Sequence, residues 1–370
     1  MTNKPNPYCA ILLLLLAGSG AAQAQMAYHI SARIDNPDME GKKMYLEVPD
    51  NKARIDSATV ENGQIRMAGT APWPHFVRID SEDFQEFALF VLEDSVVIDF
   101  KAHRALPVGP LNRALQAYSA QKDSLWAGLN RKEQMLQEQY PDPKEHGQKL
   151  AEEWTQTIDQ LFALYEDWIR SHPSDGVGEA VWRDGSVDAI MYNRGAETLQ
   201  TLYSQLSPQL RSLQSAERGR KNIEGLKATA VGQPFVDIAG ITAEKKPARL
   251  SDFAGKGKFT VVDFWASWCG PCRQEGRETL KPLWEKYKDG GNVTIVSVAV
   301  FDEFSRTLKA LEEDGYTWPQ IIDADKNTME QYGIVAIPHI LLIAPDGTIL
   351  ARGLRGGGIE QEILKHIDKH

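Results

Sequence analysis

Two cysteines three positions apart constrain this chain of 370 residues more than any other feature. Cys269 and Cys272 enclose a glycine and a proline, and they follow an apolar run, residues 259–265, typical of a strand buried on both faces. A disulfide that closes so short a loop removes little entropy from the unfolded chain, so it contributes little stability. The pair therefore predicts redox chemistry rather than a structural crosslink.

The spacing of the two thiols has a chemical reason. If a helix begins at the motif, Cys269 lies at its N-terminus, where unpaired N–H groups and the helix dipole stabilise a thiolate. The thiolate is the attacking species in disulfide exchange. Cys272 lies one turn further on the same face, from which it can attack a mixed disulfide. Pro271 suits the first helical turn because it has no N–H to donate.

The N-terminal residues resemble an export signal. Lys4 precedes an apolar stretch, residues 10–17, and small residues follow up to Ala24 in the pattern of a signal-peptidase site. A membrane span needs about 20 consecutive apolar residues, and this stretch is shorter. We therefore expect residues 1–24 to be a signal peptide cleaved after Ala24, with export to the periplasm or cell envelope. Cys9 would leave with it, so the mature protein would keep one thiol pair.

Composition and motifs exclude several other functions. The formal charge of -10 argues against a nucleic-acid partner, because binding to phosphate backbones depends on Lys and Arg. No phosphate-binding glycine loop is present, and Arg273 stands where a CxxCH haem motif would need histidine. One CxxC lacks the four ligands of a structural zinc site. Ala266 occupies the place of the Thr or Ser that precedes a peroxidatic cysteine. We expect no cofactor and no metal.

Three kinds of sequence pattern follow one another along the chain. Residues 26–108 form short alternating runs, with an Asn-Gly turn at 62 and 63, which predict an antiparallel β-sandwich domain. Residues 109–228 change to helical spacing and predict a helical region and linker, the linker lying at about 221–232. From residue 229 to residue 370, strand and helix signals alternate and predict an α/β domain.

Longer motifs add a resemblance to a known family. Residues 262–272 resemble the active-site strand and loop of thioredoxins, and the resemblance covers residues 229–370. The flanking motifs are similar to those of the exported TlpA/ResA branch of thiol:disulfide oxidoreductases. The preceding part resembles the β-sandwich and helical extension of Bacteroidetes-type envelope proteins (DUF4369-like). The motifs that carry these two resemblances are residues 231–235, 250–256, 275 and 332–338 for the branch, and 55–57 and 61–63 for the extension.

The resemblance implies roles for particular residues. Asp263 matches the buried acid that exchanges a proton as the resolving thiol reacts, and Glu275 matches the acid that tunes the thiols. Pro338 matches the cis-proline that faces the cysteines, and Ile337 precedes it where many thioredoxins have threonine. Trp268 would flank the exposed sulfur. These residues, with the two cysteines, form the expected catalytic and substrate-binding set.

The resemblance also leaves open points. Gly276 follows Glu275, whereas a proline is frequent there in this branch, and His339 is expected to pack within its strand rather than touch the thiols. We expect a protein-disulfide reductase that acts on envelope proteins, including those of cytochrome c maturation, and receives electrons from a membrane donor of the thiol-transporting type. The alternatives are a disulfide isomerase and a client-binding envelope protein with an accessory redox domain. Oligomeric state stays open.

Overall fold

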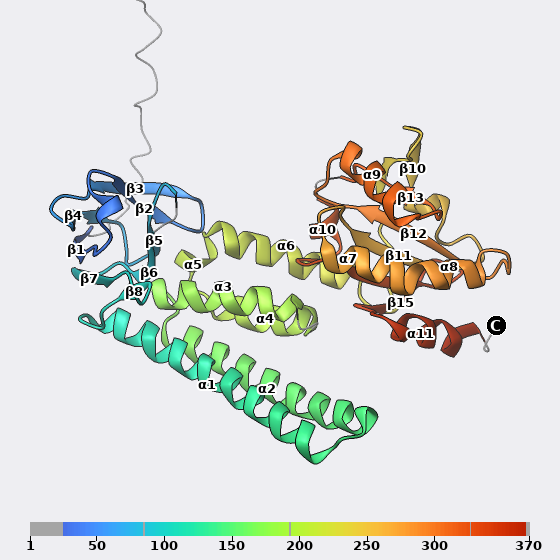
Figure 1. Cartoon of the computed structure of the whole chain (residues 1–370), viewed down its shortest axis with the longest axis horizontal. Helices are drawn as coiled ribbons and strands as arrows, with labels where there is room; N and C mark the ends of the chain where they lie inside the picture. Colours follow the sequence, from blue (N-terminus) through green and yellow to red (C-terminus); the bar gives the residue numbers. More distant parts are fainter. Residues whose placement is uncertain (1–24, 84–85, 192–193, 326, 368–370) are drawn as a thin grey trace, which may run out of the picture. The chain divides into compact units, whose positions relative to one another are not determined.

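The computed structural model describes residues 25–83, 86–191, 194–325 and 327–367 (Figure 1). The chain divides into two compact units, Met1–Leu115 and Gln116–His370. The expected signal peptide, its cleavage site after Ala24 and Cys9 lie outside the described residues. Within the described ranges, no helix combines the length and the apolar character that crossing a membrane requires.

The strands of the first unit form one eight-stranded sheet in the order β3-β2-β5-β6-β8-β7-β1-β4. Most neighbours are antiparallel, but β1 pairs with β7 and β6 with β8 in parallel. The edge strands β3 and β4 are joined by a turn in which Asn62 and Gly63 have φ of 53° and 66°, the backbone that a two-residue hairpin needs. The sheet therefore folds back around one apolar core. Its strands are β1 (Met26–Arg33), β2 (Lys43–Val48), β3 (Ala53–Thr59), β4 (Gln64–Ala71), β5 (Phe76–Ser81), β6 (Phe87–Val91), β7 (Ser95–Asp99) and β8 (Arg104–Ala105).

A buried carboxylate of this unit caps the first long helix, α1 (Pro110–Gln139). Glu93 accepts hydrogen bonds from the N–H groups of Leu111 at 3.2 Å and Asn112 at 3.1 Å. These groups lie in the first helical turn, where backbone N–H groups have no partner within the helix. A Cβ atom at Gly109 would lie 2.1 Å from the Glu93 carboxyl, so only glycine leaves room for this cap.

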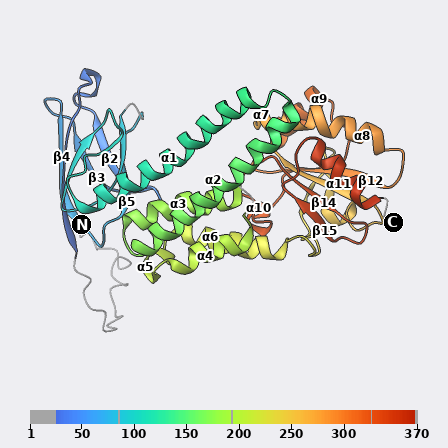
Figure 2. The same cartoon turned by 90° about the horizontal axis from the view of Figure 1, so that it is seen from below.

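Six helices follow the sheet in the described part of the chain, and sequence periodicity missed two of them, α3 and α6. Helices α1 and α2 run side by side in both views (Figure 1 and Figure 2). Helix α3 is buried on several faces, including Val177, Val181 and Trp182, so its apolar residues do not form the single stripe that marks an amphipathic helix. The helices after α1 are α2 (Pro143–Ser171), α3 (Gly176–Met191), α4 (Gly195–Gln205), α5 (Pro208–Arg211) and α6 (Gln214–Ala228).

The linker expected at residues 221–232 is wrong over most of its length. Residues 221–228 are the last turns of α6, which packs against the short helix α10 (Thr328–Gln331). A Cβ atom at Gly225 would lie 2.1 Å from the carbonyl oxygen of Glu330, so the missing side chain allows the two backbones to touch. Sequence patterns do not indicate this contact, because its two sides are far apart in the chain.

The C-terminal part has the predicted thioredoxin fold. A five-stranded sheet has the order β13-β12-β11-β14-β15, with β11 parallel to β12 and antiparallel to β14. All residues of the central strand β11 are buried, as its continuous apolar run predicts. Its elements are β11 (Phe259–Trp265), β12 (Val293–Ala299), β13 (Gln320–Ile321), β14 (His339–Ile343), β15 (Ile349–Arg352), α7 (Gly270–Glu275), α8 (Lys281–Tyr287), α9 (Phe304–Asp314), α10 and α11 (Gly357–Ile367), beside a small sheet of β9 (Ala239–Ile241) and β10 (Pro247–Arg249).

Candidate active site

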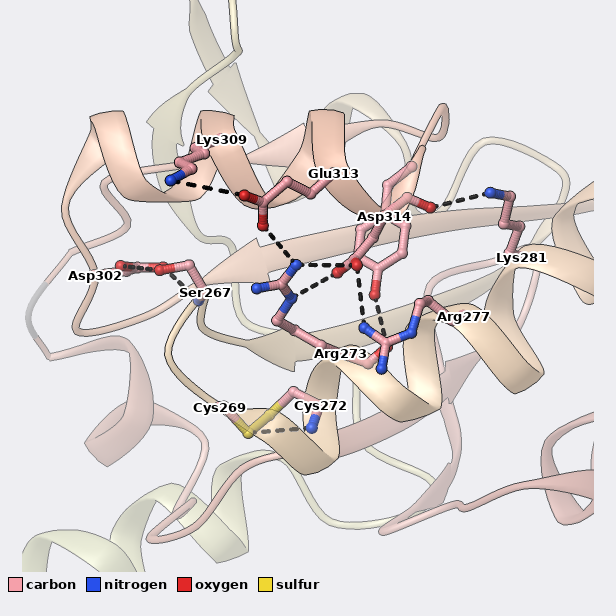
Figure 3. A network of polar contacts seen from close by, with 11 residues as sticks. Ser267, Cys269, Cys272, Arg273, Arg277, Lys281, Asp302, Lys309, Glu313 and Asp314 are labelled. Atoms are coloured by element: carbon pink, nitrogen blue, oxygen red, sulfur yellow. Dashed lines mark hydrogen bonds and ion pairs between the residues drawn. A yellow bond between two sulfur atoms is a disulfide. The ribbon is translucent and has the colours of Figure 1, made fainter.

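The two cysteines form a disulfide at the N-terminus of α7 (Figure 3). Cys269 is the N-cap residue, and the backbone N–H of Cys272 donates to its Sγ atom at 3.2 Å. This is the position predicted from the spacing, where the N–H groups of a helix start can stabilise a negative sulfur. Both residues are buried in this oxidised state, and the carbonyl oxygen of Ile337 lies 3.8 Å from the Cys269 Sγ.

Hydrogen bonds join the loop before the disulfide to the segment that follows β12. The hydroxyl and the backbone N–H of Ser267 donate to the Asp302 carboxylate at 2.8 Å and 2.5 Å. Trp268 is 60% exposed, yet its indole N–H donates to the Phe301 carbonyl at 3.0 Å. Asp302 also accepts a hydrogen bond from Thr307 at 3.0 Å. Sequence reasoning placed Trp268 beside the sulfur but missed Asp302, which lies 35 residues from Ser267.

The predicted cis peptide bond is present between Ile337 and Pro338. Ile337 is partly buried against the apolar cluster that contains both cysteines. The structure therefore brings Ile337 and Cys269 together. Their contact with a substrate stays a prediction.

Asp263 lies on the side of the sheet that faces the active-site helix. Side chains alternate along a strand, so Asp263 shares a face with Val261 and Trp265. Val261 belongs to the same apolar cluster as Leu280, which follows α7, and Trp265 belongs to the same apolar cluster as Cys272. Asp263 is 4% exposed, which makes it a carboxyl group within the core on this face of the sheet.

The hydrogen bonds of Asp263 leave one of its oxygens without a partner. Ser297 donates from its hydroxyl to Oδ2 at 2.9 Å, and Trp318 donates from its indole N–H to the Ser297 Oγ at 2.8 Å. Within the described part of the chain, Oδ1 has no hydrogen-bond partner. Burial raises the pKa of Asp263 to about 7; the Ser297 hydrogen bond and the charge of Arg355 oppose this rise, and Glu275 adds to it.

Glu275 faces the loop before α11 rather than open solvent. Its Oε1 atom accepts a hydrogen bond from the N–H of Gly356 at 2.8 Å. One π-helical turn, Gly276–Leu280, follows it. The hydroxyl of Tyr316 donates to the Arg273 carbonyl at 2.9 Å, and a Cβ atom at Gly276 would lie 2.1 Å from that hydroxyl oxygen. The glycine that departs from the family pattern is therefore required by the close approach of Tyr316.

An ion-pair network holds the active-site helix against α9 (Figure 3). Arg273 donates to both carboxylate oxygens of Asp314, at 2.7 Å and 3.0 Å, and to Glu313 at 2.9 Å. Arg277 reaches Asp314 at 3.0 Å. Burial alone would raise the pKa of Asp314, but the hydrogen bonds from the two arginines outweigh it and lower this pKa. The network positions Arg273, the residue directly after Cys272. In the sequence, the only indication of this network is the four-residue spacing of Arg273 and Arg277, which places both on one side of a helix.

His339 takes part in strand packing, as expected, and not in the redox pair. Its ring meets Phe264 at a centroid distance of 6.5 Å, on the face opposite to Asp263. Burial, with the charges of Arg352 and Arg355, lowers the pKa of His339 to about 3, so it is neutral at physiological pH. Within the described ranges, no three His, Cys, Asp or Glu side chains converge on a point that would hold a metal ion.

A dithiol at a helix start, above a buried acid that titrates near neutrality, defines a thioredoxin-fold protein of thiol-disulfide exchange. Residues 230–363 match the Redoxin family, and residues 28–105 match a domain of unknown function, DUF4369. Over 141 residues the chain is 30% identical to the thiol-disulfide oxidoreductase ResA of Geobacillus thermodenitrificans (strain NG80-2), covering 38% of this chain and 78% of that protein. The chain belongs to the ResA-like thiol-disulfide oxidoreductases and has a DUF4369 domain ahead of its redox domain.

Two further relatives have the same kind of chemistry in their names. The chain is 36% identical over 118 residues to the thiol:disulfide interchange protein CycY of Rhizobium leguminosarum bv. viciae, covering 30% of this chain and 61% of that protein. It is 35% identical to the solved thioredoxin domain of a thiol-disulfide oxidoreductase from Bacteroides vulgatus, which spans 37% of this chain and 98% of that structure with a TM-score of 0.34. These likenesses cover the redox domain.

Proposed function

We propose that this protein is an exported dithiol reductase that reduces disulfides of envelope proteins through Cys269 and Cys272. The observation that carries the proposal is the Cys272 N–H directed at the Cys269 sulfur at the start of α7, 3.2 Å away. That arrangement favours the thiolate of Cys269 and so its attack on a disulfide. Export rests on the signal-like pattern of residues 1–24.

The proposed reaction moves two electrons and two protons to the client. The Cys269 thiolate attacks one client sulfur, and the other client sulfur leaves as a thiolate that takes up a proton. Asp263 then accepts the proton of Cys272, whose sulfur attacks Cys269 in the mixed disulfide. The client sulfur that was bonded to Cys269 leaves and is protonated. The protein ends as the Cys269–Cys272 disulfide seen in the structure.

The surroundings of Asp263 suit it to this proton transfer. A general base works best when its pKa lies near the working pH, because the ionised form is then populated and still basic enough to take a proton. Burial brings the pKa of Asp263 to about 7. The partnerless Oδ1 atom is available for the exchanged proton, since Oδ2 is occupied by Ser297.

The client chain is proposed to lie beside Ile337. Because the Ile337 carbonyl is 3.8 Å from the Cys269 Sγ, an extended client whose cysteine reaches that sulfur runs alongside this backbone. Trp268 offers an exposed aromatic surface on the other side. We propose that the clients include haem-site thiols of apocytochromes c, because the redox domain resembles the TlpA/ResA branch, whose clients include them.

The oxidised protein must be reduced again before each new cycle. This step needs a dithiol donor that is itself oxidised to a disulfide, since two electrons return to the Cys269–Cys272 pair. The sequence has no nucleotide-binding motif through which the chain could collect electrons itself. We propose a membrane protein of the thiol-transporting type as the donor.

Trapping of the mixed disulfide tests the proposal. Reduced Cys272→Ser should accumulate a covalent adduct with a disulfide peptide, detected by intact mass, because no resolving thiol remains. The matched variant Cys269→Ser should form far less adduct, because Cys269 is the N-cap residue whose sulfur accepts the N–H of Cys272, whereas Cys272 lies inside the first helical turn. Adducts on Cys269→Ser instead would reverse the assigned roles. No reduction of the peptide by the wild-type dithiol would refute the reductase function.

A further inference from the structure

A pocket of about 580 Å³ lies among α1, α3 and α6, next to the redox domain. Its walls include Trp126 of α1, Val187 of α3, and Arg218 and Asn222 of α6. Val335 of the redox domain completes the lining. The volume falls in the range of pockets that bind small molecules or peptide side chains. At this pocket, residues of the helical region and Val335, which lies shortly before the cis-proline Pro338, line the same cavity.

The pocket begins close to the redox pair. Val335 precedes Ile337 by two positions, and the Ile337 carbonyl lies 3.8 Å from the Cys269 Sγ. Val335 is 37% exposed, which is unusual for an aliphatic side chain beside an active site. An extended polypeptide covers about 3.3 Å per residue, so a client segment two to four residues from its cysteine reaches this pocket.

The helical wall is firmly attached to the redox domain. The Arg352 side chain donates to the carbonyl oxygens of Thr229, just after α6, and of Tyr332, just after α10, each at 2.6 Å. A Cβ atom at Gly333 would lie 2.5 Å from the Leu226 side chain, which shows how closely the two parts pack. These contacts join the end of α6, one wall of the pocket, to the redox domain near Val335.

The charged groups of the pocket leave one cation available. Asp184 accepts hydrogen bonds from Tyr118 at 2.7 Å and from Lys122. Asp188 accepts one from Tyr165, and burial raises the pKa of Asp188. Arg218 is exposed and, among the residues that the structure describes, has no ion-pair or hydrogen-bond partner. An acidic group that enters the pocket would find this guanidinium unoccupied.

The other walls suit a polypeptide. Asn222 lines the pocket, and its side-chain amide makes no hydrogen bond to any described residue. An amide carries both donors and an acceptor, as a peptide backbone requires. Val187 is 47% exposed and offers apolar surface together with Val335. The lining thus combines an amide for backbone pairing, apolar surface and the exposed guanidinium of Arg218, beside two further cations, Lys122 and Arg183.

We propose that this pocket binds the client segment next to its target cysteine and that Arg218 selects an acidic side chain in that segment. The inference rests on the proposed reductase function and assigns the helical region the role of a second wall of the client site. Clients whose cysteine is flanked by aspartate or glutamate are then reduced faster than those flanked by lysine.

Two disulfide peptides that differ only in Asp or Lys three residues from the cysteine test this selection. For the wild-type dithiol, kcat/KM should be about two- to fivefold higher for the Asp peptide, the range that an exposed ion pair provides. Arg218→Gln should bring the ratio near one, and Arg218→Glu should reverse it. Arg220→Gln is the matched control, because Arg220 lies on the same helix but pairs with Glu217 and Glu224.

Two further measurements separate the possible failures. Asn222→Asp adds a negative charge to the pocket and removes the amide donors, so it should lower kcat/KM for both peptides and more strongly for the Asp peptide, even if the Arg218 variants fold poorly. Hydroxyethyl disulfide, which is small and neutral, should be reduced at the same rate by every variant. An unchanged peptide ratio in Arg218→Gln, or an equal change in Arg220→Gln, overturns the inference. Failure of the wild type to reduce hydroxyethyl disulfide overturns the reductase function instead.

Discussion

The N-terminal sheet and the redox sheet each bury a carboxyl group, and their surroundings differ. Glu93 accepts two backbone N–H groups of α1 and the side-chain amide of Asn112 at 2.5 Å. Asp263 receives one hydroxyl, and its second oxygen has no partner in the described chain. Both are less than a tenth exposed.

The difference separates a structural acid from a reactive one. Glu93 accepts three N–H donors at a helix start, so its carboxyl group stabilises the fold. A single hydroxyl does not compensate for burial, so the pKa of Asp263 rises to about 7. The number and kind of donors therefore distinguish Asp263, the proposed proton acceptor, from an equally buried carboxyl group.

The largest expected effect is on the rate of resolution. Asp263→Asn keeps the size of the side chain but cannot accept a proton, so release of the client from the mixed disulfide should slow about 10²-fold or more at pH 7. Single-turnover reduction of a disulfide peptide measures this step. Glu93→Gln, the matched change in the other sheet, should leave the rate unchanged. Equal slowing in both variants would remove the distinction between the two acids.

The stability of the oxidised protein should depend on pH through Asp263. Its pKa in the folded state, about 7, lies above the ordinary aspartate value of 3.8. The folded state therefore binds the proton more tightly than the unfolded state, and stability falls as pH rises from about 4 to 7, by up to about 4 kcal/mol. In denaturant titrations, Asp263→Asn should lack this decline and exceed the wild type at pH 8. A parallel pH profile in both proteins would contradict the raised pKa.

The structural role of Glu93 predicts an effect on folding alone. Glu93→Ala leaves the N–H groups of Leu111 and Asn112 unpaired in the core, which should cost about 1–3 kcal/mol of unfolding free energy. The exposed Glu61→Ala should cost under about 0.5 kcal/mol. Thermal unfolding followed by circular dichroism compares them. Lower disulfide exchange by folded Glu93→Ala would show that this acid is not purely structural.

The smallest effect concerns the hydroxyl beside Asp263. Ser297→Ala removes the donor that favours the carboxylate of Asp263. The pKa of Asp263, read as the midpoint of its titration, should therefore rise by about one pH unit. Trp318→Phe, which frees the Ser297 hydroxyl to turn away, should raise it less. The carboxyl band in infrared spectra across a pH series reports this midpoint. A midpoint that moves in neither variant would show that the hydrogen-bond chain does not set the pKa.

Local signals predicted the redox domain well. The apolar strand and the Cys-Gly-Pro-Cys loop each occupy a few consecutive residues, and the structure confirms the thioredoxin fold that they implied. The disulfide at the start of α7 and the cis bond before Pro338 are also present as predicted. Short-range patterns of this kind can be recognised in a single sequence because they depend on the backbone conformation near the motif.

Long-range contacts could not be predicted in the same way. Ser297 reaches Asp263 across 34 residues, and Trp318 reaches Ser297 across 21, so both depend on the register of β11 beside β12 and on where β13 arrives. The docking of α6 at Gly225 depends on a carbonyl from α10. A serine in a strand and a glycine in a helix look ordinary until their partners are known.

The reduction potential of the Cys269–Cys272 couple tests the proposed reductase most directly. The purified protein is equilibrated with a glutathione or dithiothreitol redox series, and the fraction of dithiol is measured by thiol labelling. Cys272→Ser is the control that has no reversible couple. We predict a potential near that of thioredoxin, about -270 mV, which makes the dithiol a reductant in an oxidising compartment. A potential above about -200 mV, in the range of isomerases and oxidants, would contradict it.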